Sequence, residues 1–144
     1  MTFTEQYVAL MMAILNADGK QEPEEIAKVR EMAADLGLDM AEVERLITAE
    51  TEKPHKLEAA ARSVQKKGDA EQLMEACTLV ALSDKYLDHR EVEMLLDIAG
   101  WMKLKPTKAV LTIAAIAQND RSILIEGNAA LHDEDTIEEE IDGE

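Results

Sequence analysis

The sequence approximately repeats itself after 66 residues, and this repeat restricts the possible folds more than any other feature. The shift aligns three carboxylates in each half: Asp18 with Asp84, Glu22 with Asp88, and Glu25 with Glu91. It also aligns apolar residues that recur every three or four positions, which is the spacing of one helix face. We therefore expect two copies of a helix–acidic loop–helix unit, over about residues 5–47 and 71–113, packed against each other.

The composition predicts an all-α fold, an internally duplicated bundle of seven to eight helices. Apolar residues make up 47% of the chain but aromatic residues only 3%, so Leu, Ile, Val, Ala and Met must fill the core. Such side chains suit closely packed helices better than a β-sandwich. With 144 residues in all, we expect one helical domain over residues 1–131 and an acidic, disordered tail over residues 132–144.

Capping signals locate the expected helix ends. Thr2 and Glu5 form a capping-box pattern at the start of a first helix. Three further expectations are a fourth helix from Pro54 to Gly68, a fifth helix capped by Asp69, and a last amphipathic helix over residues 121–131.

Each repeat places an Asp at the end of one helix, an acidic residue four positions later, and a Glu three positions after that. One interpretation is helix capping, because Asp88 and Glu91 stand three apart at a helix start. Glu22 and Glu25 likewise lie at the start of a helix, where the helix dipole favours anions. Capping does not account for the first Asp of each copy, which meets the negative end of the preceding helix dipole.

The second interpretation is a divalent cation site. A tight turn would bring the first Asp toward the acids of the next helix, and such a cluster needs a basic side chain or a hard cation. Ca²⁺ or Mg²⁺ suits all-carboxylate ligation, whereas Zn²⁺ favours His or Cys. The candidate ligands are Asp18, Glu22, Glu25, Asp84, Asp88 and Glu91. The first copy is the better candidate because Gly19 permits the turn, whereas Lys85 or Arg90 can neutralise the second copy.

The charge distribution limits the possible partners. The formal net charge is −16, and residues 132–144 hold eight acidic residues and no Lys or Arg. Such a chain repels nucleic acid and anionic membrane surfaces, so we expect protein partners with basic surfaces. The main basic cluster, within residues 53–67, has two open interpretations. It is either an ordinary solvated face or a binding surface for an acidic partner such as the chain's own tail.

No pattern of catalytic residues is present, so we expect no enzyme. The single cysteine, Cys77, excludes an internal disulfide, is expected in the core, and favours a reducing compartment. Because neither a secretory signal nor a membrane-spanning apolar run occurs, we expect a cytoplasmic location.

The acidic patterns also carry a family resemblance. Residues 15–19 read Leu-Asn-Ala-Asp-Gly and are followed by Glu25 and by Leu-Gly-Leu at residues 36–38. This series resembles the signature of the tellurite-resistance TerB-like family, and residues 81–91 resemble its second copy, so that the match covers roughly residues 5–115. The resemblance implies a duplicated helical fold, an acidic cluster for a divalent metal, and stress-response or phage-defence roles. Members are thought to act in protein complexes, often near the membrane.

Three functions are consistent with these features. The first is a non-catalytic stress-response or defence module that binds protein partners and a divalent metal through its acidic loops. The second is a structural interaction adaptor whose acidic tail docks on a basic partner, without a metal. The third is a metal-dependent hydrolase that uses paired carboxylates.

Overall fold

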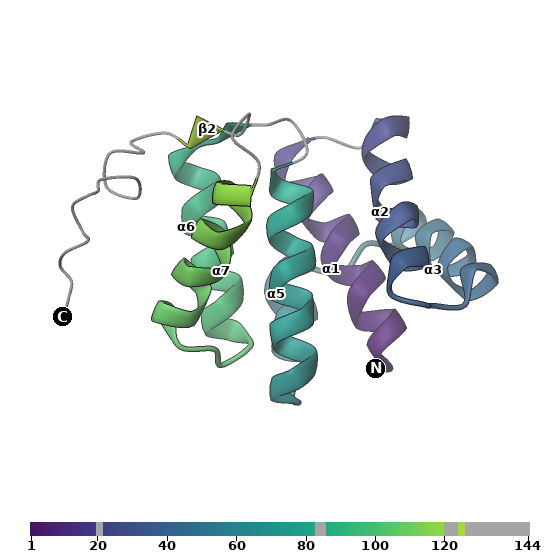
Figure 1. Cartoon of the computed structure of the whole chain (residues 1–144). Coiled ribbons are helices and arrows are strands. Elements are labelled where there is room, and N and C mark those ends of the chain that lie inside the picture. The colour runs from purple at the N-terminus through teal and green to yellow at the C-terminus, as the bar shows by residue number, and fades with distance from the viewer. Residues whose placement is uncertain (20–21, 83–85, 120–123, 126–144) are drawn as a thin grey trace, which may run out of the picture.

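A computed structural model describes residues 1–19, 22–82, 86–119 and 124–125 of the chain. Over these residues the protein forms seven helices and one short pairing of two strands (Figure 1). The helices are α1 (Phe3–Asp18), α2 (Pro23–Asp35), α3 (Met40–Glu52), α4 (Leu57–Arg62), α5 (Lys67–Ala81), α6 (His89–Trp101) and α7 (Pro106–Asn119). The strands are β1 (Tyr86–Leu87) and β2 (Leu124–Ile125). The prediction of a helical domain is confirmed, with the two-residue strand pairing as an unpredicted addition.

The centre of the bundle is α1. Every residue from Gln6 to Leu15 is buried, so this helix is enclosed on all sides rather than along one stripe. It packs against α3, α4 and α5, and Figure 1 shows α2 and α3 on one side of α1 and α5, with α6 and α7 on the other. Each fully buried Leu, Ile or Met of α1 contributes roughly 1.5–3 kcal/mol of transfer free energy, which makes this helix the main apolar contribution to the fold.

The capping box predicted for α1 is confirmed. The Thr2 hydroxyl accepts a hydrogen bond from the Glu5 amide at 3.2 Å, and the Thr2 amide donates to the Glu5 carboxylate at 2.7 Å. The hydrogen bond from the backbone of Thr2 is the main reason that the pKa of Glu5 lies below its ordinary value. Thr2 and Glu5 are close in sequence, so the motif specifies the helix start without contacts from the rest of the fold.

The predicted ends of the fourth and fifth helices are wrong. The structure has α4 only over Leu57–Arg62, and Gly68 lies inside α5 instead of ending α4. Ser63 follows the last residue of α4, and its carbonyl oxygen accepts a hydrogen bond from the Gln6 side chain of α1 at 2.9 Å. Asp69 is the third residue of α5, whose N-cap position is taken by Lys66 without any side-chain hydrogen bond.

Two helices end in the same left-handed turn. After α2, Gly37 has φ 75°, and the Leu38 amide donates to the Ala33 carbonyl at 3.1 Å. After α6, Lys103 has φ 64°, and the Leu104 amide donates to the Ala99 carbonyl at 2.8 Å, which is the same Schellman pattern. Lys103 is the one residue other than glycine with a positive φ in the described part of the chain.

The segment after α7 corrects a further prediction. Leu124 and Ile125 form β2, which pairs in parallel with β1 in the register Tyr86 to Leu124 and Leu87 to Ile125. These two residues are therefore not part of the helix predicted over residues 121–131. Pairing to β1 gives these residues hydrogen-bond partners that their sequence alone does not reveal. The rest of the predicted helix over residues 121–131 and the acidic tail lie outside the described residues. None of the described helices has the length and apolar character needed to cross a membrane.

Candidate functional site

The first acidic segment, residues 18–25, begins where α1 ends. Asp18 is the last residue of α1, and Gly19 follows in the left-handed conformation with φ 68°. The Gly19 amide donates to the Asn16 carbonyl at 3.2 Å, which is a common way to close a helix. The predicted role of Gly19 in turning the chain is therefore confirmed.

The start of α2 supplies the other two acids of this segment. Glu22 occupies the N-cap position and is exposed, but its carboxylate makes no capping hydrogen bond. Pro23 is the first helical residue, as predicted, and Glu25 lies half-buried in the first turn. The side chain of Glu22 is therefore not used to satisfy the free amides of α2, although the helix dipole still favours its charge there.

The second acidic segment, residues 84–91, is built differently over residues 86–91, which the structure describes. Asp88 occupies the N-cap position of α6 and accepts a hydrogen bond from the Glu91 amide at 2.9 Å. In return, the Glu91 carboxylate accepts a hydrogen bond from the Asp88 amide at 3.1 Å, and Glu91 is 6% exposed. Arg90 lies 3.7 Å from the Asp88 carboxylate, but its side chain is largely exposed, so the ion pair is weak. The capping interpretation is confirmed for Asp88 and Glu91.

The six candidate ligands are not assembled into one described cluster. Asp88 and Glu91 lie together, whereas Glu22 and Glu25 share only the first turn of a different helix. Asp84 lies outside the described residues, and Asp18 is described only by its position at the end of α1. Over the ranges that the structure describes, no group of three or more His, Cys, Asp or Glu residues is placed to hold a metal ion.

A contact between a buried Glu and a partly exposed His was not predicted from the sequence. Glu50, near the end of α3, is 5% exposed and accepts a hydrogen bond from the His55 amide at 3.0 Å. The His55 ring nitrogen Nδ1 lies 2.5 Å from the other carboxylate oxygen of Glu50. The sequence gives no signal for this contact, because the burial of Glu50 depends on how α3 packs. The contact holds His55, in the connection between α3 and α4, against Glu50 of α3.

Cys77 lies in the core, as predicted. It is fully buried in α5, and burial raises the pKa of its thiol to about 12. Since the thiolate is the nucleophilic form, this residue is unsuited to catalysis near neutral pH.

The fold and these segments define a helical domain in which two acidic segments each link a pair of consecutive helices, α1 to α2 and α5 to α6. The model of one protein family, described as tellurite resistance protein TerB, matches residues 4–112. The chain therefore belongs to the TerB family, which confirms the resemblance seen in its acidic patterns. Searches of curated proteins and of solved structures gave no match.

Proposed function

We propose that this TerB-family protein is a non-catalytic, cytoplasmic module of tellurite resistance or a related stress response. It binds protein partners with basic surfaces, and it binds Ca²⁺ or Mg²⁺ through Asp18, Glu22 and Glu25 of the first acidic segment. The observation that carries the metal role is the exposed Glu22, which stands at the start of α2 without capping it. A hard cation is the partner that such carboxylates around a tight turn suit best.

We also propose that the domain arose by internal duplication with an offset of 66 residues. The bounds of α2 and α6 differ by this offset at both ends, and so do the starts of α3 and α7. Support also comes from the paired Schellman turns, in which Gly37 and Lys103 occupy equivalent positions. On this proposal, the second acidic segment is the copy that kept its capping role and lost its cation site.

Calorimetric titration with Ca²⁺, Mg²⁺, Mn²⁺ and Zn²⁺ tests the metal role. We expect heat from Ca²⁺ or Mg²⁺ with the unchanged chain and none with Asp18→Asn. Asp88→Asn is the matched control, because Asn caps a helix as well as Asp does and leaves the first segment intact. The absence of heat at millimolar metal, or heat that Asp18→Asn leaves unchanged, would remove the metal from the proposal.

The alternative is an interaction adaptor without a metal, whose acidic tail docks on a basic partner. One observation favours it: Asp88 and Glu91 use their carboxylates to cap α6. Affinity capture from cell extract, with the full chain and with a chain that lacks residues 132–144, separates the possibilities. Loss of partners with the tail supports the adaptor, whereas an unchanged set of partners counts against it.

A further inference from the structure

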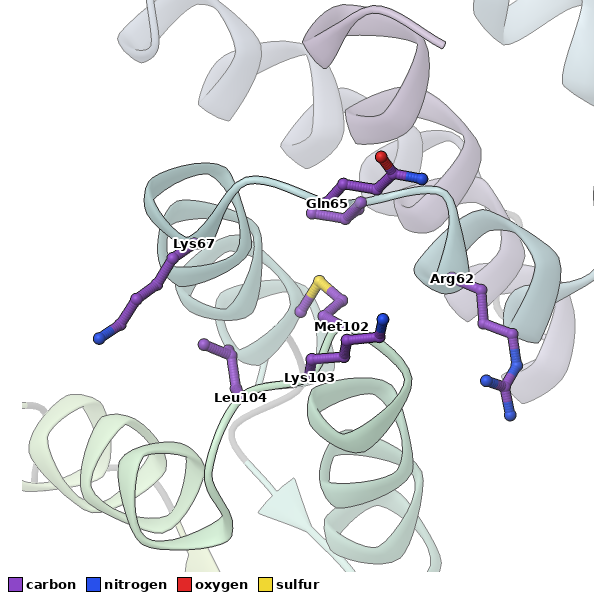
Figure 2. A pocket seen from close by; sticks show the side chains of 7 residues that line it. Arg62, Gln65, Lys67, Met102, Lys103 and Leu104 are labelled. Carbon is purple, nitrogen blue, oxygen red and sulfur yellow. The ribbon is translucent and has the colours of Figure 1, made fainter.

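Two adjoining hollows lie where the α4–α5 connection meets the turn between α6 and α7. The first, of about 510 Å³, has an apolar part formed by the buried Val64, Met102 and Leu104. Figure 2 shows Arg62 and Lys67 extending outward at opposite ends of this space, with Lys103 and Met102 between them. The second hollow, of about 420 Å³, shares Lys67, Lys103 and Leu104 with the first and adds Lys105 and Lys108 among its lining residues. We call both together the basic hollow.

The charge of the basic hollow is opposite to that of the chain. Among the described residues, five of the chain's 15 Lys and Arg residues line it, and Glu71 is the one acidic residue that does. Glu71 pairs with Lys108 at 3.9 Å, and Arg62 pairs with Glu58 at 2.6 Å. The other three lining cations form no ion pair with any described residue: Lys67, Lys103 and Lys105. A concentration of cations that no described residue pairs, on a chain with net charge −16, indicates a surface for an anionic partner.

The backbone at Lys103 adds an independent observation. The turn after α6 needs a left-handed residue, and the equivalent turn after α2 uses Gly37, which adopts that conformation without strain. Lys103 takes the same conformation at φ 64°, although a side chain makes it unfavourable. Strained residues concentrate at functional positions, and here the strain places a cation between the two hollows.

The start of α5 strengthens the preference for anions. No side chain caps this 15-residue helix, and Lys66 and Lys67 stand at its first positions. The free amides and the positive end of the helix dipole therefore face an environment already rich in cations.

We propose that the basic hollow binds the acidic tail, residues 132–144, of the same molecule. The tail carries eight acidic residues and no Lys or Arg, so its charge is complementary to the cations of the hollow that no described residue pairs. The apolar part of the hollow suits the isoleucines of the tail, Ile137 and Ile141. This inference concerns a different surface from the acidic segments and does not depend on a metal.

The length of the chain permits this contact. The described structure ends at β2, and Figure 1 places β2 at the end of α6 and α7 opposite to the α6–α7 turn. The 14 residues of α7 cover about 21 Å along this direction. Residues 126–131 span about 20 Å when fully extended, so the acidic tail that follows them is able to reach the hollow.

Attachment to the same chain favours the tail over a free acidic partner. A tethered segment has an effective concentration on the order of millimolar. A separate acidic protein, in contrast, must approach against the net negative charge of the chain. A docked tail is also withheld from basic partners. The basic hollow therefore competes with those partners for the tail.

The test places a nitroxide on the tail of the full chain through Glu139→Cys. The buried Cys77 does not react, so the label is specific. We expect the nitroxide to weaken the amide NMR signals of residues 65–67 and 102–105. The effect should be lost in the double variant Lys67→Glu/Lys105→Glu and in about 0.5 M salt, which screens charge beyond a few ångströms. The double variant Lys28→Glu/Arg45→Glu changes the net charge equally on α2 and α3 and should leave the effect intact.

Each outcome of this experiment decides the proposal. Normal signals around the hollow in the labelled chain overturn it, and so does weakening that survives the reversal of Lys67 and Lys105. A mixture of nitroxide-labelled chain and isotope-labelled chain without nitroxide reports contacts between molecules. Weakening that is as strong in this mixture shows a tail bound to a second copy, which also contradicts docking within one molecule.

Discussion

The hydroxyl of Tyr7 donates a hydrogen bond of 2.7 Å to the main-chain carbonyl oxygen of Val29, and both residues are fully buried. This bond joins α1 to α2, the two helices that flank the first acidic segment. A buried hydroxyl without a partner is unfavourable, so the contact restricts how the two helices pack. Burial also raises the pKa of the Tyr7 phenol well above its ordinary value.

Removing this hydroxyl should destabilise the protein. We expect Tyr7→Phe to lower the free energy of unfolding by about 1–2 kcal/mol, because a buried hydrogen bond is lost while the ring still fills its place. Urea unfolding followed by circular dichroism measures the change. Thr48→Val is the matched control: it removes an exposed hydroxyl on α3 that bonds within its own helix and should cost under about 0.5 kcal/mol. Equal effects of the two substitutions would show that the Tyr7 bond contributes little.

Exchanging Lys and Gly between the two Schellman turns should have opposite effects on the free energy of unfolding. Lys103→Gly should raise the free energy of unfolding by about 0.5–1 kcal/mol, because relief of left-handed strain exceeds the added freedom of glycine in the unfolded chain. Gly37→Lys should lower it by a similar amount, about 0.5–1 kcal/mol, since a Cβ at Gly37 meets no atom within 4 Å and only the backbone matters. Chemical denaturation of both variants checks this. A loss of stability in Lys103→Gly would refute the assignment of strain to Lys103.

The capping box of α6 predicts a difference between two substitutions at one position. Asp88→Ala should lower the free energy of unfolding by about 1 kcal/mol, because the Glu91 amide loses its acceptor. Asp88→Asn keeps an acceptor oxygen and should cost less than half as much. Thermal and urea unfolding of both proteins provide the comparison. If Asn were as harmful as Ala, the charge of Asp88 rather than its hydrogen bond would be the stabilising feature.

The buried thiol of Cys77 predicts a dependence of stability on alkaline pH. Its ordinary pKa of 9.0 applies to the unfolded chain, and burial raises the native value to about 12. Between these values the native state binds the proton and the unfolded state does not. The free energy of unfolding should therefore fall as the pH rises above 9.0, by up to about 1.4 kcal/mol per pH unit.

Cys77→Ala isolates this contribution. The variant will be less stable at every pH because it leaves a cavity, so the slopes are compared and not the absolute values. Urea unfolding between about pH 8 and about pH 10 should show a steeper fall for the unchanged chain than for Cys77→Ala. Burial is the largest cause of the raised pKa of Tyr7 and acts in both proteins, whereas the smaller contribution from the charge of Cys77 is lost in Cys77→Ala and counts toward the difference between the slopes. Parallel slopes would contradict a buried, protonated thiol.

Sequence reasoning succeeded where a structural signal is contained within a few neighbouring residues. The capping boxes at Thr2 and Asp88 and the turn at Gly19 depend on backbone geometry that those residues set themselves. It failed where a distant element decides the outcome. The residue after α4 bonds to Gln6 of α1, and β2 pairs with β1, which lies more than thirty residues earlier in the chain.

The candidate site shows the same division. The sequence placed acids at the start of α2 and α6, but it could not show that Asp88 caps its helix and that Glu22 does not. The basic hollow was only partly foreseen. Arg62 and Lys67 belong to the basic cluster seen in the sequence, whereas Lys103, Lys105 and Lys108 join them because α6 and α7 turn beside the start of α5.

The central claim is a cation site in the first acidic segment. Its most direct test is an amide NMR titration of the full chain with Ca²⁺ and Mg²⁺. We predict that one of these cations shifts the signals of residues 16–25, leaves those of residues 88–92 unchanged, and has no such effect on Asp18→Asn. Asp88→Asn should respond as the unchanged chain does. Signals of residues 16–25 that stay fixed at millimolar cation, or that shift equally in Asp18→Asn, would contradict a cation site in the first acidic segment.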